Sequence, residues 1–228
     1  MHRVAKKSFK TLIFALLGSV ALSSSALAEM TLSVYGGANF SPHSSVDYNL
    51  NDGAGPQTFS PSWDGASFEF PPYYGIRGTW WMEDMPNWGI ALDFTHSKVK
   101  ANVPINGFGV LEFTDGINFF TANALYRWDE TEMGLRPYAG LGAGFVMPRV
   151  EVVHTNIPQA TDEFQITGAA FQAMVGAEYA LTDDWSVFGE LKSSYGMVDA
   201  DLNGGGSLET NIISNQVILG VTYKLPVD

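Results

Sequence analysis

Imidazoles and carboxylates are the side chains of this sequence whose types and spacing could do chemistry. Beyond residue 28 the chain holds three histidines in or beside segments expected to connect strands, namely His43, His96 and His154. Carboxylates near the same segments include Glu69, Glu112 and Asp115. If these groups converge on one rim, they could bind a divalent metal ion or transfer protons.

We therefore predict catalytic roles for Glu69, Asp115 and His96, with a carboxylate as the base, and metal ligation by His43, His96 and Glu112. The sequence does not identify the metal. HExxH and EF-hand spacings are absent, so a solvated or hydrogen-bonded loop residue remains the alternative for each histidine.

Other catalytic machinery is missing at the level of motif. The sequence has no G-x-S-x-G elbow, no phosphate-cradling loop and no dinucleotide fingerprint, which excludes the common hydrolases and nicotinamide enzymes. A serine–histidine–carboxylate arrangement at the rim, using Ser44 or Ser97, stays open.

The N-terminal segment predicts export. Four basic residues precede an apolar stretch of about a dozen residues, too short for a membrane helix, and Ala26-x-Ala28 supplies a small-residue cleavage site. We predict a signal peptide over residues 1–28 and one domain over residues 29–228. The whole chain has 12 Lys and Arg against 24 Asp and Glu and no cysteine. Nucleic acid is therefore excluded as a partner, and so is a disulfide scaffold.

Alternation of apolar and polar residues predicts eight strands, at residues 30–40, 67–82, 88–98, 116–128, 136–148, 167–181, 185–198 and 212–225. The connections between them alternate regularly between long and short. The long ones cover residues 41–66, 99–115, 149–166 and 199–211. This rhythm is typical of an up-and-down transmembrane β-barrel with four long extracellular loops, short periplasmic turns and periplasmic termini.

The two faces of the predicted strands differ in polarity. Side chains such as Phe70, Ile76, Leu92 and Leu219 fall on the face expected to meet lipid. The opposite face sends charged side chains into the lumen: Glu69, Arg77, Asp93, Arg127, Glu178, Glu190 and Lys192. Eight strands leave no open pore, so we expect an ion-pair network in preference to a proton-conducting or catalytic site. Four tryptophans flank the short turns, as in an interfacial girdle: Trp80, Trp88, Trp128 and Trp185.

Several stretches resemble known outer-membrane proteins. Residues 136–145 (RPYAGLGAGF), 176–190 and 219–223 are similar to the OmpA-like outer-membrane β-barrel superfamily. More specific stretches resemble the lipid A oxidase family: Pro42-His43-Ser44, Phe68-Glu69-x-Pro-Pro-Tyr-Tyr-Gly75, Trp80-Trp81, Leu111–Gly116 and Gly204–Thr210.

The second resemblance implies an oxygen-dependent conversion of the proximal glucosamine of lipid A to 2-aminogluconate, with hydrogen peroxide as the other product. It implies no catalytic residues, and a divalent metal ion is one way to activate dioxygen for this reaction. The alternative is a structural or adhesive barrel whose acidic loops contact lipopolysaccharide without catalysis. Either protein is expected to be monomeric, with lipid A and outer-membrane lipid as its partners.

Overall fold

The computed structural model describes residues 27–226. The predicted signal peptide lies almost wholly outside these residues, so it and the boundary at residue 29 stay predictions. No helix within residues 27–226 is long and apolar enough to cross a membrane. The strands of this part of the chain are β1 (Leu27–Phe40), β2 (Val46–Asn49), β3 (Gln57–Phe59), β4 (Trp63–Asp64), β5 (Tyr74–Met82), β6 (Trp88–Ala101), β7 (Phe108–Arg127), β8 (Leu135–His154), β9 (Thr161–Phe164), β10 (Gly168–Ala180), β11 (Trp185–Leu202) and β12 (Gly206–Leu225).

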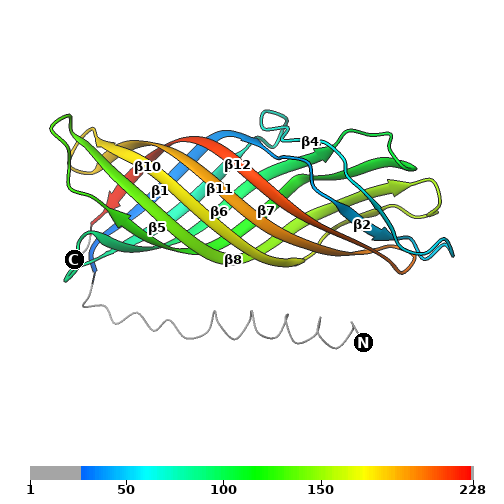
Figure 1. Cartoon of the computed structure of the whole chain (residues 1–228). Helices are drawn as coiled ribbons and strands as arrows, with labels where there is room; N and C mark the ends of the chain where they lie inside the picture. Colours follow the sequence, from blue (N-terminus) through cyan, green and yellow to red (C-terminus); the bar gives the residue numbers. More distant parts are fainter. Residues whose placement is uncertain (1–26, 227–228) are drawn as a thin grey trace.

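Eight of these strands form a closed antiparallel ring. The order around it is β1-β5-β6-β7-β8-β10-β11-β12, and pairing of β12 with β1 closes it. Figure 1 shows β1 in blue crossing beside β12 in red. The predicted eight-stranded up-and-down barrel is therefore confirmed. β2 and β3 extend the wall beside β12, β4 pairs with β6, and β9 pairs with β8.

The two ends of the ring differ. We call the end with the turns at residues 83–87, 128–134 and 181–184 the proximal end; β1 starts and β12 finishes there. The opposite end, at the right of Figure 1, is the distal end. It carries β2, β3, β4 and β9.

The distal connections differ from the prediction. Residues 99–115 and 199–211 were expected to be long loops, but β6–β7 and β11–β12 continue as paired strands and close through residues 102–107 and 203–205. Residues 67–73, expected to begin a strand, form an irregular segment before β5. Pro71 and Pro72 lie in this segment and cannot donate backbone hydrogen bonds to a neighbouring strand.

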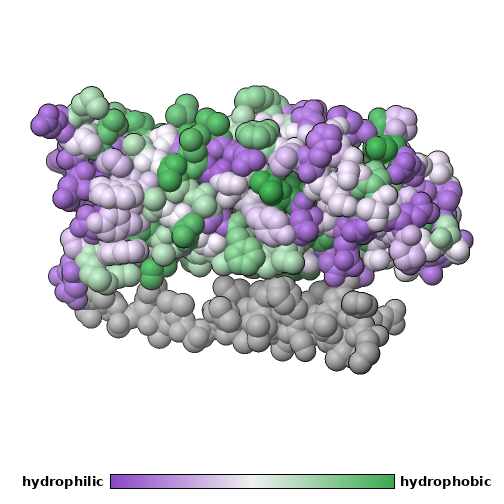
Figure 2. Space-filling view, viewed as in Figure 1, coloured by the Kyte–Doolittle hydropathy of each residue, from purple (hydrophilic) through white to green (hydrophobic). Residues whose placement is uncertain are grey.

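Side-chain orientation in the middle of the barrel follows the predicted pattern. Leu92 and Leu219 are 54% and 73% exposed on the outer wall, whereas Arg77 and Asp93 are buried inside the ring. In Figure 2 apolar side chains gather along the proximal half and the middle of the wall, and polar side chains dominate the distal end. The proximal end carries the expected aromatic girdle, because Trp88 and Trp185 lie with their ring centres 5.0 Å and 4.7 Å from tyrosine rings.

The distal half has a dry interior that the sequence analysis did not anticipate. Polarity inverts along the strands there, so that Val99 and Phe113 point inward and are fully buried while charged neighbours such as Lys100 face outward. Val46, Tyr48 and other side chains of β2–β4 join this core from the first connection. The barrel mouth is therefore filled by apolar packing.

Candidate functional site

A network of four charged side chains occupies the middle of the lumen. The Arg77 guanidinium donates from Nε to Asp93 at 2.7 Å and from both terminal nitrogens to Glu190 at 2.7 and 2.8 Å. Lys192 Nζ lies 3.6 Å from Asp93 and donates to the Tyr35 hydroxyl at 2.8 Å. Two cations thus face two carboxylates, and the four charges sum to zero.

Hydroxyl groups complete the network. Tyr138 donates to Glu190 at 2.8 Å, and Tyr35 donates to Asp93 at 2.5 Å. Every charged group is therefore both paired and hydrogen-bonded, which is the condition under which buried charges are tolerated. This geometry fits the predicted ion-pair network.

Three side chains predicted for the lumen lie outside it or near its proximal end. Glu69 is exposed on the outer wall, since residues 67–73 form no strand and the alternation does not extend to them. Arg127 is part-buried at the proximal end, where it pairs with Glu29 at 2.9 Å and lies 4.0 Å over the Trp81 ring. Glu178 is half-buried and accepts a hydrogen bond from a serine.

A second cluster lies on the outside of the barrel, where residues 66–73 cover the outer face of β6. We call Glu69, His96, Lys98, Lys100 and Glu112 the outer-wall site. Lys100 pairs with the Glu69 carboxylate at 3.0 Å and stands directly opposite Glu112 on β7. The structure thus brings together three predicted site residues, Glu69, His96 and Glu112, on one face of the wall.

His96 is buried although it points away from the lumen. Its Nδ1 lies 3.0 Å from Asn118 Oδ1, and its ring stacks on Tyr74 with the ring centres 4.9 Å apart. Asn118 Nδ2 donates to the Met147 carbonyl at 3.2 Å, so Oδ1 is the atom that faces the imidazole. Nδ1 of neutral His96 is therefore the donor and Nε2 carries the lone pair. The Pro71 carbonyl lies near this ring, and within the described residues Nε2 makes no hydrogen bond of good geometry.

Lys98 is also buried on the outer face, at 2% exposure. Its Nζ donates to the Glu69 backbone carbonyl at 3.1 Å. Sequence reasoning missed Lys98 and Lys100. The signal that could have found them is the row of outward positions 96, 98 and 100, where apolar side chains give way to basic ones.

The other predicted site residues lie apart. Asp115 pairs with Arg149, and Arg149 Nε also donates to Asp162 at 2.6 Å. These hydrogen bonds hold the pKa of the Asp162 carboxyl below its ordinary value. His43 is exposed next to Ser44, whose hydroxyl lies 3.0 Å from that of Thr210 on β12 and accepts a hydrogen bond from Trp63 of β4 at 2.8 Å.

The predicted metal ligands do not assemble. Among residues 27–226 no three His, Asp or Glu side chains approach closely enough to hold a metal ion. The set His43, His96 and Glu112 is therefore not brought together. The residues present do not fit the divalent ion proposed from the sequence.

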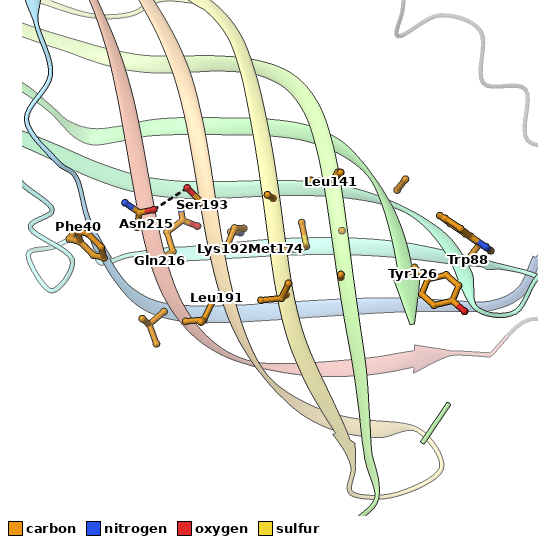
Figure 3. Close-up of a pocket in the computed structure, with 16 residues that line it drawn as sticks. Phe40, Trp88, Tyr126, Leu141, Met174, Leu191, Lys192, Ser193, Asn215 and Gln216 are labelled. Atoms are coloured by element: carbon orange, nitrogen blue, oxygen red, sulfur yellow. Dashed lines mark hydrogen bonds between the residues drawn. The ribbon is translucent and has the colours of Figure 1, made fainter. Parts of the chain in front are cut away.

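A shallow hollow of about 680 Å³ runs along the outer wall (Figure 3). It extends from Trp88 and Tyr126 to Phe40, over small side chains such as Ala139 and Ala173. The Ser193 hydroxyl donates to Asn215 at 3.0 Å in the same region. Its mainly apolar lining suits hydrocarbon better than a polar substrate.

Comparisons with known proteins agree with this architecture. The sequence profile of the outer membrane protein beta-barrel domain family matches residues 12–224. The outer membrane protein OprG of Pseudomonas aeruginosa is 16% identical over 88% of this chain and 98% of its own, with a TM-score of 0.50. Neisserial surface protein A is 15% identical over 86% of this chain and 97% of its own, with a TM-score of 0.48. A comparison with curated proteins found no match. At 16% identity the OprG structure shows a shared fold alone.

Proposed function

Because the chain belongs to the outer membrane protein beta-barrel domain family, we propose that it lies in the outer membrane of a Gram-negative bacterium and binds lipid A through the outer-wall site. In this orientation the distal end faces the cell exterior and the proximal turns face the periplasm. Support comes from the connection between β1 and β5, which spans residues 41–73 at the distal end, whereas the proximal turns span residues 83–87, 128–134 and 181–184. Periplasmic turns of such barrels are short. One chain closes the ring, so a monomer suffices.

The height of the outer-wall site supports this partner. Ten positions separate Trp88, in the proximal girdle, from Lys98 on β6. A strand that rises about 3.3 Å per residue at a tilt of about 40° gains about 25 Å over that distance, the height of an outer-membrane apolar band. Lys98 and Lys100 therefore reach the level of the outer-leaflet headgroups, where lipid A carries its sugars and phosphates.

The chemistry of the site matches both parts of that lipid. Phe68 and Phe70 are 86% and 93% exposed beside it, an arrangement that suits acyl chains. The Lys100 ammonium, with its side chain 39% exposed, offers a cation for a phosphate, and Glu69 offers a carboxylate to sugar hydroxyls. The observation that carries the proposal is this juxtaposition of exposed phenyl rings with a lysine at headgroup height.

The test compares lipids in one binding assay. Native mass spectrometry of the purified protein in detergent micelles measures retention of lipid A and of phosphatidylglycerol. We expect preferential retention of lipid A, weakened in a Phe68→Ser/Phe70→Ser variant. Arg136→Gln is the matched control for a surface change at the proximal end. Equal retention of the two lipids by the wild-type protein would refute lipid A binding.

A second candidate function is oxidation of the bound lipid. Two of the segments that resemble lipid A oxidases, Phe68–Gly75 and Leu111–Gly116, lie far apart in sequence and meet at β6 in the structure. In this reading Glu69, held by Lys100, removes a proton from the sugar. His96 is covered, and Asp115 is paired with Arg149 away from the outer-wall site, so Glu69, with its side chain 58% exposed, is the member of the predicted catalytic set that is exposed within this site.

The oxidation would transfer two electrons from the anomeric carbon of the proximal glucosamine to dioxygen. Hydrogen peroxide forms, and water opens the resulting lactone to 2-aminogluconate. Mass spectrometry of lipid A from cells with and without the protein tests this function. We expect a gain of one oxygen that Glu69→Gln abolishes. Identical spectra would refute oxidation and leave lipid A binding as the proposed function.

A further inference from the structure

Lys98 is a buried cation without a direct ion pair among the described residues; the Glu69 and Glu112 carboxylates act on it only from beyond contact distance. Among the described residues no carboxylate oxygen lies within ion-pair distance of its Nζ, which donates to the neutral Glu69 carbonyl. Lys192, the other buried lysine, lies 3.6 Å from Asp93 and donates to two hydroxyls. Burying an ammonium without a counter-ion costs several kcal/mol. An anion that reached Lys98 would recover that cost.

His96, two positions away on the same outer face, has an unused acceptor. The hydrogen bond with Asn118 fixes the donor at Nδ1. The Pro71 carbonyl of the covering segment lies near the ring, but it is an acceptor and cannot satisfy the buried Nε2 lone pair. Residues i and i+2 of a strand lie about 6.5 Å apart on one face. An ammonium and a lone pair at that spacing suit a ligand with an anionic group and a neighbouring hydroxyl.

One segment covers both groups. Residues 66–73 are fixed at their base, where Asn39 N donates to Ser67 Oγ at 2.8 Å and Tyr73 N donates to the Ser67 carbonyl at 2.8 Å. The tip is held differently, because Phe68 and Phe70 point into the surroundings and Lys98 binds the intervening Glu69 carbonyl. A phosphate could replace that carbonyl as the acceptor for Lys98.

We infer that Lys98 and His96 form a subsite for a sugar phosphate, with a phosphate monoester on Lys98 and an adjacent hydroxyl on His96 Nε2, and that residues 66–73 cap it until the ligand binds. The inference rests on the proposed function, since lipid A is a phosphorylated glucosamine disaccharide at the right height. The cap lifts when Phe68 and Phe70 enter the acyl region of the leaflet.

The test uses the full chain in detergent micelles and two variants. Lys98→Met should weaken binding of phosphorylated lipid A by about tenfold or more and leave dephosphorylated lipid A unaffected. In the absence of lipid, the same variant should raise the thermal unfolding midpoint, because it removes an unbalanced buried charge. His96→Phe should weaken binding of glucosamine phosphate but not of inorganic phosphate. Both binding equilibria are measured by ³¹P NMR. Arg136→Gln is the control for loss of a positive charge.

The outcomes separate the two proposals. If wild type prefers phosphorylated lipid A but Lys98→Met binds it equally well, the subsite is wrong and the lipid A proposal stands. If wild type shows no preference for lipid A yet Lys98→Met loses glucosamine phosphate, the subsite takes a soluble sugar phosphate and the lipid A proposal is wrong. Inorganic phosphate that binds wild type as tightly as glucosamine phosphate would refute the role of His96. A lower unfolding midpoint with unchanged affinities would make Lys98 structural.

Discussion

Removal of Arg77 should destabilise the barrel strongly, and the structure sets the size of the effect. Arg77→Met leaves Asp93 with Lys192 and Tyr35, but among the described residues it leaves Glu190 with a hydrogen bond from the Tyr138 hydroxyl and no contacting cation. Breaking a buried pair by deleting one partner costs about 3–5 kcal/mol. We expect a loss of that size in the free energy of unfolding.

A charge-balanced double variant tests the reason for the loss. Arg77→Met/Glu190→Leu removes one cation and one anion, so the remaining Asp93–Lys192 pair keeps the lumen neutral. Replacing a buried pair with apolar side chains is often neutral or stabilising, so the double variant should lose about 1 kcal/mol or less. The coupling energy between the two positions should then be about 2 kcal/mol or more.

Urea unfolding in lipid vesicles, followed by tryptophan fluorescence, measures these values, and the shift in gel mobility of heated against unheated samples reports folding. A single variant that costs less than about 1 kcal/mol, or a double variant that loses the sum of both single losses, would refute a network held by mutual pairing.

Three further predictions concern the distal half. Gly116→Ala should lower the free energy of unfolding by about 1–3 kcal/mol, because φ is +110° there and a Cβ would meet a neighbouring imidazole. Gly109→Ala, where a Cβ would enter open space, should be near neutral. Urea unfolding midpoints compare the two variants. Phe113→Ala should lower the free energy of unfolding in detergent by about 3–5 kcal/mol, whereas Phe70→Ala, at an exposed position, should lower it by about 0.5 kcal/mol or less. The folded-state pKa of Asp162 is lowered from 3.8, so its stabilisation is present above that pH and fades as the pH falls below it. In a plot of the unfolding midpoint against pH, Asp162→Asn should reduce the fall of the midpoint below that pH.

The ring of strands could be read from the sequence because polarity alternates strongly within it. Ile76 and Arg77, or Leu92 and Asp93, are adjacent residues whose side chains suit opposite solvents, and both pairs lie as predicted. A shift of one residue would put a charge into hydrocarbon, so the sequence tolerates only one register. The closed ring follows from eight such strands with short proximal turns.

The outer-wall site could be predicted only in part. Glu69, His96 and Glu112 carry recognisable chemistry, but their neighbourhood depends on how residues 66–73 fold over β6. That fold is set by contacts over long sequence distances, such as those between Ser67 and Asn39. His43 lies in the same distal connection as Glu69, yet it joins no metal-binding cluster with His96 and Glu112.

The distal strand extensions escaped prediction for a physical reason that also locates the membrane. Within the apolar band, as at Leu92 and Asp93, the apolar residue points out and the polar one points in. Farther along the same strand Val99 points in and Lys100 points out. A search for strands with apolar residues outside and polar residues inside ends where this alternation inverts, and it assigns the remaining residues to a loop. In the proposed orientation water surrounds the wall beyond this point, so burial of apolar side chains inside the barrel becomes favourable there. The outer-wall site lies at the inversion, which is where a lipid headgroup would meet it.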